Sequence, residues 1–303
     1  MNFLINRDFM GKIKRKKGVL SMPKKIAITT ESSADLSKEY QKKFDIRVIP
    51  MTVIVGDEEF KDGVDITPTE LFEKSELYSC VPKTAGVSPH EYRLVFETLT
   101  QKGFDVVHVA LSSKISSCFQ NALFASNGFE NVFVVDSMNL SAGAAMLAIE
   151  GSRLRACGET AKEIAKKLEL LRLKVNTSFI LEDTEFLLKG GRCKKGEKLA
   201  ADILSLRPTV NIEDGSLSVG KKFRGKDLSA QKKYIEETLS SARPKKELCL
   251  LNYTAFSQDE VDELVSFSKA KGGFENVIVN EAGCCVSSHC GKRCMGIIFE
   301  DEK

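Results

Sequence analysis

Short apolar runs alternate with strongly capped helices through the first half of the chain, and this alternation limits the possible folds more than any other feature. Two helix starts, at residues 67–70 and 88–91, each combine a hydroxyl residue at the N-cap, proline at the first helical position and glutamate at the third. The apolar runs at 25–30, 106–111 and 132–136 have the length and composition of buried strands. This β-α-β-α order predicts an α/β fold whose first sheet is largely parallel, with helices on both faces.

The pattern changes near residue 175. Residues 210–212 and 217–219 alternate around Asp214-Gly215, which indicates a hairpin and hence antiparallel pairing. We expect a basic extension (1–22), an N-terminal α/β domain (23–174) and a smaller C-terminal α/β domain with a mixed sheet (175–303). The other expected elements are strands at 46–55, 179–181, 247–253, 277–281 and 294–300, and helices at 33–44, 116–127, 139–156, 160–173, 227–241 and 257–272, with a short helix ending at Gly190 and a further one leading to Arg207.

Positive charge is concentrated at the start of the chain. Residues 1–25 contain eight Lys or Arg and one Asp, although the net charge is only +3. The remainder is therefore mildly acidic, which argues against a nucleic-acid-binding surface. For residues 1–22 we expect disorder, or a start codon placed too early before Met22; transient contact of this extension with an anionic membrane surface or RNA is the alternative.

The sequence predicts a soluble, cytoplasmic protein. No apolar run reaches the roughly 18 residues of a membrane helix, and the N-terminus lacks the apolar core of a signal peptide. The nine cysteines are then expected to be reduced rather than paired in disulfides.

A glycine-bounded segment near the C-terminus holds His289 and four cysteines between two apolar runs, and is interpreted as a loop between strands. Cys290 and Cys294 have the spacing of zinc ligands, and a cysteine activated by His289 is a second possibility. Against a metal, there is no second compact cysteine pair, and adjacent Cys284 and Cys285 would point to opposite faces of a strand. Against a nucleophile, no orienting carboxylate can be placed beside it.

Two hydroxyl-rich loops precede helices in the first half, at 82–89 and 111–120. In open α/β sheets, ligands bind beyond the carboxyl ends of the strands, where helix N-termini offer N–H donors to anions. Capping explains Ser88 completely. It does not explain Thr84, which lies four residues earlier, and Ser116 can both cap a helix and contact a ligand.

A series of short motifs, in order from about residue 25 to residue 303, resembles the DegV family. Each motif alone has low specificity for the family, but their order and spacing together are specific. They lie at 30–36 (Thr-Glu-Ser-Ser-Ala-Asp-Leu), 49–54, 61–68, 82–84, 112–116, 188–192, 207–208 and 289–296. The chain departs from the family pattern at Glu31, where aspartate is usual, at 117–119, and at Cys290, Lys292 and Arg293.

The resemblance implies a bacterial protein that holds a long-chain fatty acid in a tunnel between two α/β domains. Family members present the bound acid to a separate ATP-binding kinase subunit, which phosphorylates the carboxylate. Arg224, after the hairpin, would lie at the mouth and assist kinase docking or phosphoryl transfer. Carried over by motif position, Thr84, Ser116 and His289 would contact the carboxyl group. Ser117, Lys292 and Arg293, where the chain departs from the family pattern, are candidates for accessory contacts.

Elementary physics is compatible with that implication. A carboxylate can be buried only if donors satisfy its lone pairs, and two hydroxyls and an imidazole can do so. A nearby cation favours its ionised form. Each buried methylene contributes on the order of 0.8 kcal/mol. We therefore expect a non-enzymatic carrier without metal or cofactor; the alternatives are a thiol- or metal-dependent enzyme using residues 284–294, and a regulatory module for another small anion.

Overall fold

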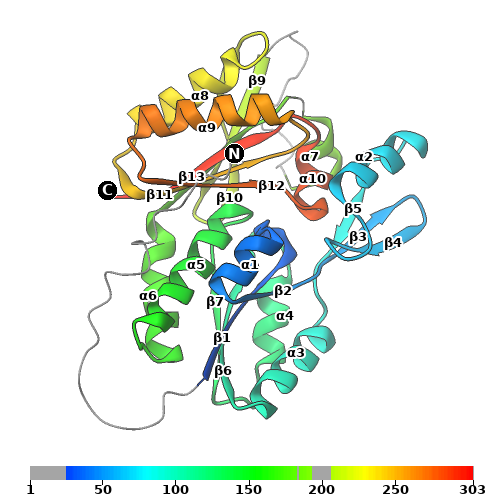
Figure 1. Cartoon of the computed structure of the whole chain (residues 1–303). Helices are drawn as coiled ribbons and strands as arrows, with labels where there is room; N and C mark the ends of the chain where they lie inside the picture. The colour runs from blue at the N-terminus through cyan, green and yellow to red at the C-terminus, as the bar shows by residue number, and fades with distance from the viewer. Residues whose placement is uncertain (1–24, 183, 193–205, 303) are drawn as a thin grey trace.

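The first sheet is parallel and carries helices on both faces. The computed structural model describes residues 25–182, 184–192 and 206–302, and Figure 1 shows how its elements are arranged. The strand order is β2-β1-β6-β7, with strands β1 (Lys25–Glu31), β2 (Ile46–Ile49), β6 (Phe104–Ala110) and β7 (Val132–Asp136). One face packs against α3 (Pro89–Gln101) and α4 (Cys118–Ala125), and the other against α1 (Lys38–Phe44), α5 (Ala142–Ala156) and α6 (Ala161–Leu171), which η3 (Arg172–Lys174) follows.

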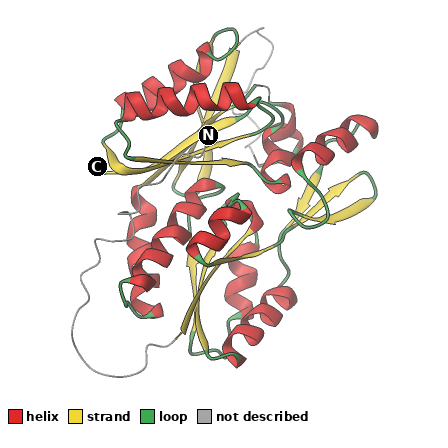
Figure 2. Cartoon of the chain, viewed as in Figure 1, coloured by secondary structure: helices red, strands yellow, loops and turns green. Residues whose placement is uncertain are grey.

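The second sheet is mixed, with the order β10-β9-β8-β13-β11-β12. Its strands are β8 (Val175–Ile180), β9 (Leu206–Glu213), β10 (Ser216–Arg224), β11 (Pro244–Tyr253), β12 (Asn276–Glu281) and β13 (Met295–Asp301). Helices α8 (Ser229–Ser240) and α9 (Gln258–Gly272) lie along one face (Figure 2). The expected α/β architecture, with a parallel sheet and a mixed sheet, is confirmed.

Helix α5 packs against both sheets. Its sequence is rich in alanine and glycine, and its apolar residues are buried on every side, as expected for a helix enclosed by protein. Its Leu147 and Ile149 share a core with Ile28 of the parallel sheet and with Leu250 and Ile298 of the mixed sheet. The division into two domains near residue 175 stays a prediction, because this core is continuous across it.

A third, antiparallel sheet was not expected. It has the order β4-β3-β5 and consists of β3 (Thr52–Val55), β4 (Glu58–Lys61) and β5 (Lys83–Ala85), with α2 (Pro68–Leu77) beside it. The single strand predicted over 46–55 is wrong, because β2 and β3 belong to different sheets. Pro50 stands between them; it has no N–H to donate to a ladder, and the chain changes sheets there.

Two other segments differ from expectation. The helix predicted over 33–44 is a short 3-10 turn, η2 (Ser32–Ala34), followed by α1, with Asp35 in the left-handed region at φ 55°. The predicted loop near the C-terminus contains a helix, α10 (Cys284–Cys290). The extension 1–22 and the helix expected before Arg207 lie outside the described residues. The capping boxes expected at Thr67 and Ser88 are confirmed.

Among the residues that the structure describes, no helix is both long and apolar enough to cross a membrane.

Candidate functional site

A cavity of about 60 Å³ lies where the three sheets meet. Most of its lining is apolar, with Leu111, Leu140 and Phe179 among the contributors. Its polar lining includes side chains from four separate segments: Thr84, Ser116, Arg192 and His289. The cavity is therefore apolar with a polar end, which suits an amphipathic ligand.

The polar end joins the two halves of the chain. Thr84 lies on β5, and His289 lies in the last turn of α10, 205 residues later. The Thr84 hydroxyl and Nε2 of His289 are 2.9 Å apart and form a hydrogen bond. The structure thus brings together Thr84 and His289, two residues that the motif comparison placed at one carboxyl group.

His289 is a neutral imidazole at physiological pH. Burial lowers its pKa to about 4, and the positive charge of Arg192 acts in the same direction. Its Nδ1 atom is buried and has no hydrogen-bond partner among the described residues. Leaving such an atom unsatisfied costs free energy, so it is a natural contact for a polar ligand group.

The Ser116 loop is fixed at both ends. Ser112, at its start, donates its hydroxyl to the carbonyl of Gly215 in the β9–β10 hairpin at 2.7 Å. The Ser116 hydroxyl accepts the N–H of Cys118 at 3.2 Å, so its own proton remains available to a ligand. Ser117 does not line the cavity, which differs from the accessory role expected for it. Its hydroxyl accepts a hydrogen bond from the side-chain amide of Asn121 at 3.4 Å.

Arg192 is the site residue that sequence reasoning missed. It follows α7 (Glu185–Lys189) and Gly190-Gly191, and it lines the cavity while donating to the carbonyl of Gly190 at 2.6 Å. The motif at 188–192 was recognised, but nothing in the local sequence showed which of the chain's many cations faces the cavity.

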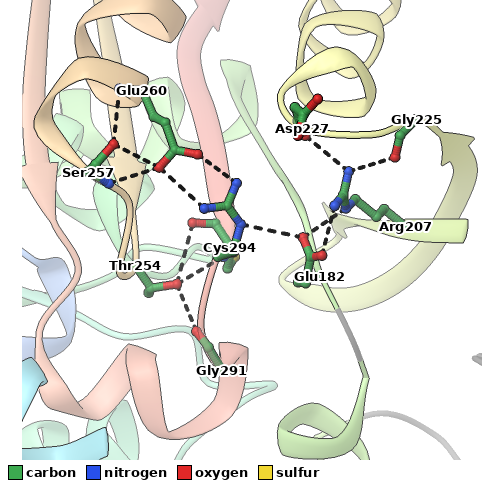
Figure 3. Close-up of polar contacts among 10 residues, drawn as sticks. Glu182, Arg207, Gly225, Asp227, Thr254, Ser257, Glu260, Gly291 and Cys294 are labelled. Carbon is green, nitrogen blue, oxygen red and sulfur yellow. Dashed lines mark hydrogen bonds and ion pairs between the residues drawn. The ribbon is translucent and has the colours of Figure 1, made fainter. Parts of the chain in front are cut away.

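The cations expected beside His289 lie elsewhere. Arg293, in the left-handed region at φ 57°, forms a bidentate ion pair with Glu260 on α9 and lies 3.9 Å from Glu182. Figure 3 labels both of these acidic partners, Glu260 and Glu182. Lys292 forms an ion pair with Glu76 on α2, and both side chains are exposed. Neither residue lines the cavity, so their expected accessory contact is corrected. Partners distant in sequence explain both placements.

Arg224 ends β10 with an exposed side chain and does not line the cavity either.

The described cysteines around His289 do not form a recognisable reactive centre. Cys284 and Cys285 lie on a helix, α10, so the strand expected for them is wrong. Burial, reinforced by the charge of Asp62, raises the pKa of both thiols, so they remain protonated at neutral pH. In the part of the chain that the structure describes, no three His, Cys, Asp or Glu side chains gather in a way that could hold a metal ion.

Comparison with known proteins gives consistent matches over nearly the whole chain. The model of the DegV family, described as uncharacterised, matches residues 25–302. A DegV domain-containing protein of Clostridium perfringens is 27% identical over 282 residues, which cover 92% of this chain and 99% of that protein.

Solved structures agree with these sequence matches. One describes fatty acid binding by a DegV family protein from Thermus thermophilus; it has a TM-score of 0.82 and 27% identity, and the match covers 91% of this chain and 99% of that one. Another, from Thermotoga maritima, is described as revealing a fatty acid binding function, with a TM-score of 0.79, 26% identity and coverage of 92% and 99%.

Proposed function

Since this chain belongs to the DegV family, we propose that it binds a long-chain fatty acid and presents the carboxylate to a separate kinase subunit. The observation that carries the proposal is the polar end of the cavity, which Thr84, Ser116, Arg192 and His289 line. There the Nδ1 atom of His289 is buried and has no hydrogen-bond partner among the described residues. The relatives described as fatty-acid-binding support it. In this proposal the protein acts as a carrier in the cytoplasm, with fatty acid as its ligand and without a cofactor.

The carboxylate is expected at the polar end. It can accept hydrogen bonds from the Ser116 hydroxyl and from the neutral imidazole of His289, and Arg192 supplies the compensating positive charge. Thr84 holds the imidazole through the bond to Nε2. A buried carboxylate needs such partners, because an unpaired charge in an apolar cavity is strongly unfavourable.

The acyl tail is expected to continue into a second cavity. This cavity has a volume of about 30 Å³ and is lined largely by apolar atoms. Leu140, Phe179, Val286 and Cys290 border both cavities, so a long acyl chain would have to displace these side chains to join the two spaces. With on the order of 0.8 kcal/mol for each buried methylene, a chain long enough to fill both spaces is favoured over a short acid.

Organic extraction and mass spectrometry of the purified protein test this proposal. We expect about one long-chain fatty acid per protein molecule, and reloading of delipidated protein with the same class of acid. Acetate serves as the comparison, since a module for another small anion would bind it as well as a long acid. A protein that is lipid-free when purified and cannot be loaded contradicts the proposal.

Presentation to a kinase needs its own test. Arg224 is exposed at the end of β10, away from the cavity lining, so its replacement leaves the ligand contacts intact. We expect Arg224→Ala to load fatty acid normally but to slow acyl-phosphate formation with ATP and the kinase subunit. Equal rates for the variant and the wild type would remove Arg224 from the proposal.

Arg192→Gln is expected to weaken fatty acid binding roughly tenfold, because a charge-assisted contact to the carboxylate is lost. The same change should raise the pKa of His289, since the positive charge of Arg192 disfavours the imidazolium. Ligand titration gives the first effect, and NMR titration of the His289 ring gives the second. Lys189→Gln, an exposed neighbour on α7, is the control and should alter neither. An unchanged affinity would place Arg192 outside the carboxylate site.

Gly190→Ala is expected to displace the imidazole. A Cβ at this position would lie 2.4 Å from Nδ1 of His289 and 3.0 Å from the carbonyl oxygen of Phe186. The backbone at Gly190 has φ −68°, which any residue accepts, so the effect is steric and local. Fatty acid affinity should fall by tenfold or more, measured against Leu188→Ala, a half-exposed position on the same helix. Wild-type affinity in Gly190→Ala would mean that the His289 ring does not need its present position.

A further inference from the structure

The N–H groups of residues 283–285, at the start of α10, donate to carboxyl groups from the first half of the chain. The N–H groups of Cys284 and Cys285 donate to the two oxygens of Asp62, at 2.8 and 3.2 Å. The N–H of Gly283 donates to Asp35 at 2.8 Å. Gly283 stands at the N-cap position and has no side chain with which to cap the helix itself.

A seven-residue helix depends on such partners. Isolated helices of this length are unstable in water, and the first N–H groups of any helix lack intrahelical acceptors. The sequence of α10, with two serines and three cysteines among its seven residues, has weak intrinsic helix propensity. A carboxylate at the N-terminus satisfies the donors and opposes the helix dipole favourably.

Asp62 adjoins the small sheet that contains Thr84. It follows β4 directly, is almost fully buried, and donates its own N–H to the carbonyl of Met51 at 2.9 Å. Strand β3 pairs with both β4 and β5, so the sheet is a single unit. Together with Asp62, this unit contacts α10 at both ends: Asp62 at the first turn and Thr84 at His289 in the last turn.

We propose that Asp62 is a positioning residue, which acts through α10 to hold the His289 imidazole against Thr84 and thereby sets the preference for a carboxylate head group over a neutral one. This inference rests on the proposed function. It assigns Asp62 no contact with the ligand. The effect of Asp62 on affinity depends on the head group, because an apolar tail makes no hydrogen bond to the imidazole.

Asp62→Asn is the direct test. An asparagine can accept one of the two N–H groups, but its amide nitrogen would face the other, so the helix start must shift. Affinities are measured for a long-chain fatty acid and for its methyl ester. We expect roughly tenfold weaker binding of the acid and unchanged binding of the ester, so that the acid-to-ester ratio falls. An unchanged ratio overturns the inference.

Thr160→Ala is the matched control for lost capping. Thr160 caps α6, a helix that contributes no side chain to the cavity among the described residues. It should lower stability without changing the acid-to-ester ratio. A fall in the ratio comparable to that of Asp62→Asn would mean that lost stability alone explains the effect, and would also overturn the inference.

Gly283→Ala keeps the test decisive if Asp62→Asn fails to fold. Its added Cβ would lie 3.2 Å from both Asp62 oxygens and 3.3 Å from Asp35, so it presses on the cap without removing charge. The ratio should fall in the same direction by a smaller factor, and no fall contradicts the inference. If the wild type binds no fatty acid, the proposed function itself is contradicted. If the wild type prefers the acid to the ester and the variant has the same preference, only the role of Asp62 is contradicted.

Discussion

A variant combining Ser116→Ala with His289→Ala is expected to lose its fatty acid while keeping its fold. Both side chains lie at the polar end of the cavity, and each can donate a hydrogen bond to the carboxylate. A charge-assisted hydrogen bond contributes about 1.5–3 kcal/mol. Losing two should therefore weaken binding by on the order of 100-fold or more. Displacement of a fluorescent fatty acid measures the affinity, and circular dichroism with thermal melting checks the fold.

Ser117→Ala is the matched control for this double variant. Its hydroxyl is adjacent in sequence but accepts from Asn121 and does not line the cavity. It should bind like the wild type. Purification of the double variant with a full complement of fatty acid would show that the tail alone retains the ligand, and the proposed carboxylate site would have to be abandoned.

The second large effect is expected in the pH dependence of stability, through Asp35. Burial raises the pKa of this carboxyl from 3.8 to about 8, and the charge of Asp62 adds to the rise. Between these pKa values the folded state holds a proton that the unfolded state has released, so the free energy of unfolding falls as pH rises from about 4 to 8. At 1.36 kcal/mol per pKa unit, the whole change is on the order of 5 kcal/mol.

Asp35→Asn should remove this dependence. The asparagine can still accept from Gly283 and approach Ser141, but its amide meets that of Asn252, so the variant should be less stable than the wild type at pH 5. With no proton to lose, it should be the more stable protein at pH 8. Urea unfolding between pH 5 and 8 measures both curves, and this window avoids acid titration of Glu91 and Glu260, whose pKa values are lowered to about 2.

Asp57→Asn, at an exposed position, is the control and should run parallel to the wild type. Parallel curves for Asp35→Asn and the wild type would mean that Asp35 is already ionised in the folded protein at neutral pH.

Local signals were enough to predict much of the fold. The capping boxes at Thr67 and Ser88 and the hairpin around Asp214-Gly215 each depend on residues close in sequence, and the structure contains all three. The third sheet lacked such a signal. Its β4 is rich in charge and partly exposed, so apolar alternation did not mark it as a strand. Pro50 was the available sign that the strand predicted over 46–55 had to break.

Distant partners decided the features that could not be predicted. Helix α10 depends on Asp62, 222 residues before Cys284, and no property of its own sequence indicates a helix. Arg293 and Lys292 looked like site residues because they are close to His289 in sequence. Their pairing with Glu260 and Glu76 directs them elsewhere, and only the tertiary structure shows it.

The order of strands in the mixed sheet has a consequence for synthesis of the chain. Strand β13 lies at the centre, between β8 and β11, yet it is translated after every other described strand. Until it emerges from the ribosome, β8 and β11 each present an unpaired edge, the kind of surface on which nascent chains aggregate or recruit chaperones. Helix α10 is made immediately before β13, so sheet closure and the arrival of His289 coincide. Fatty acid can therefore contact His289 only after residue 289 has been made, and cannot guide the folding of the segments that precede it.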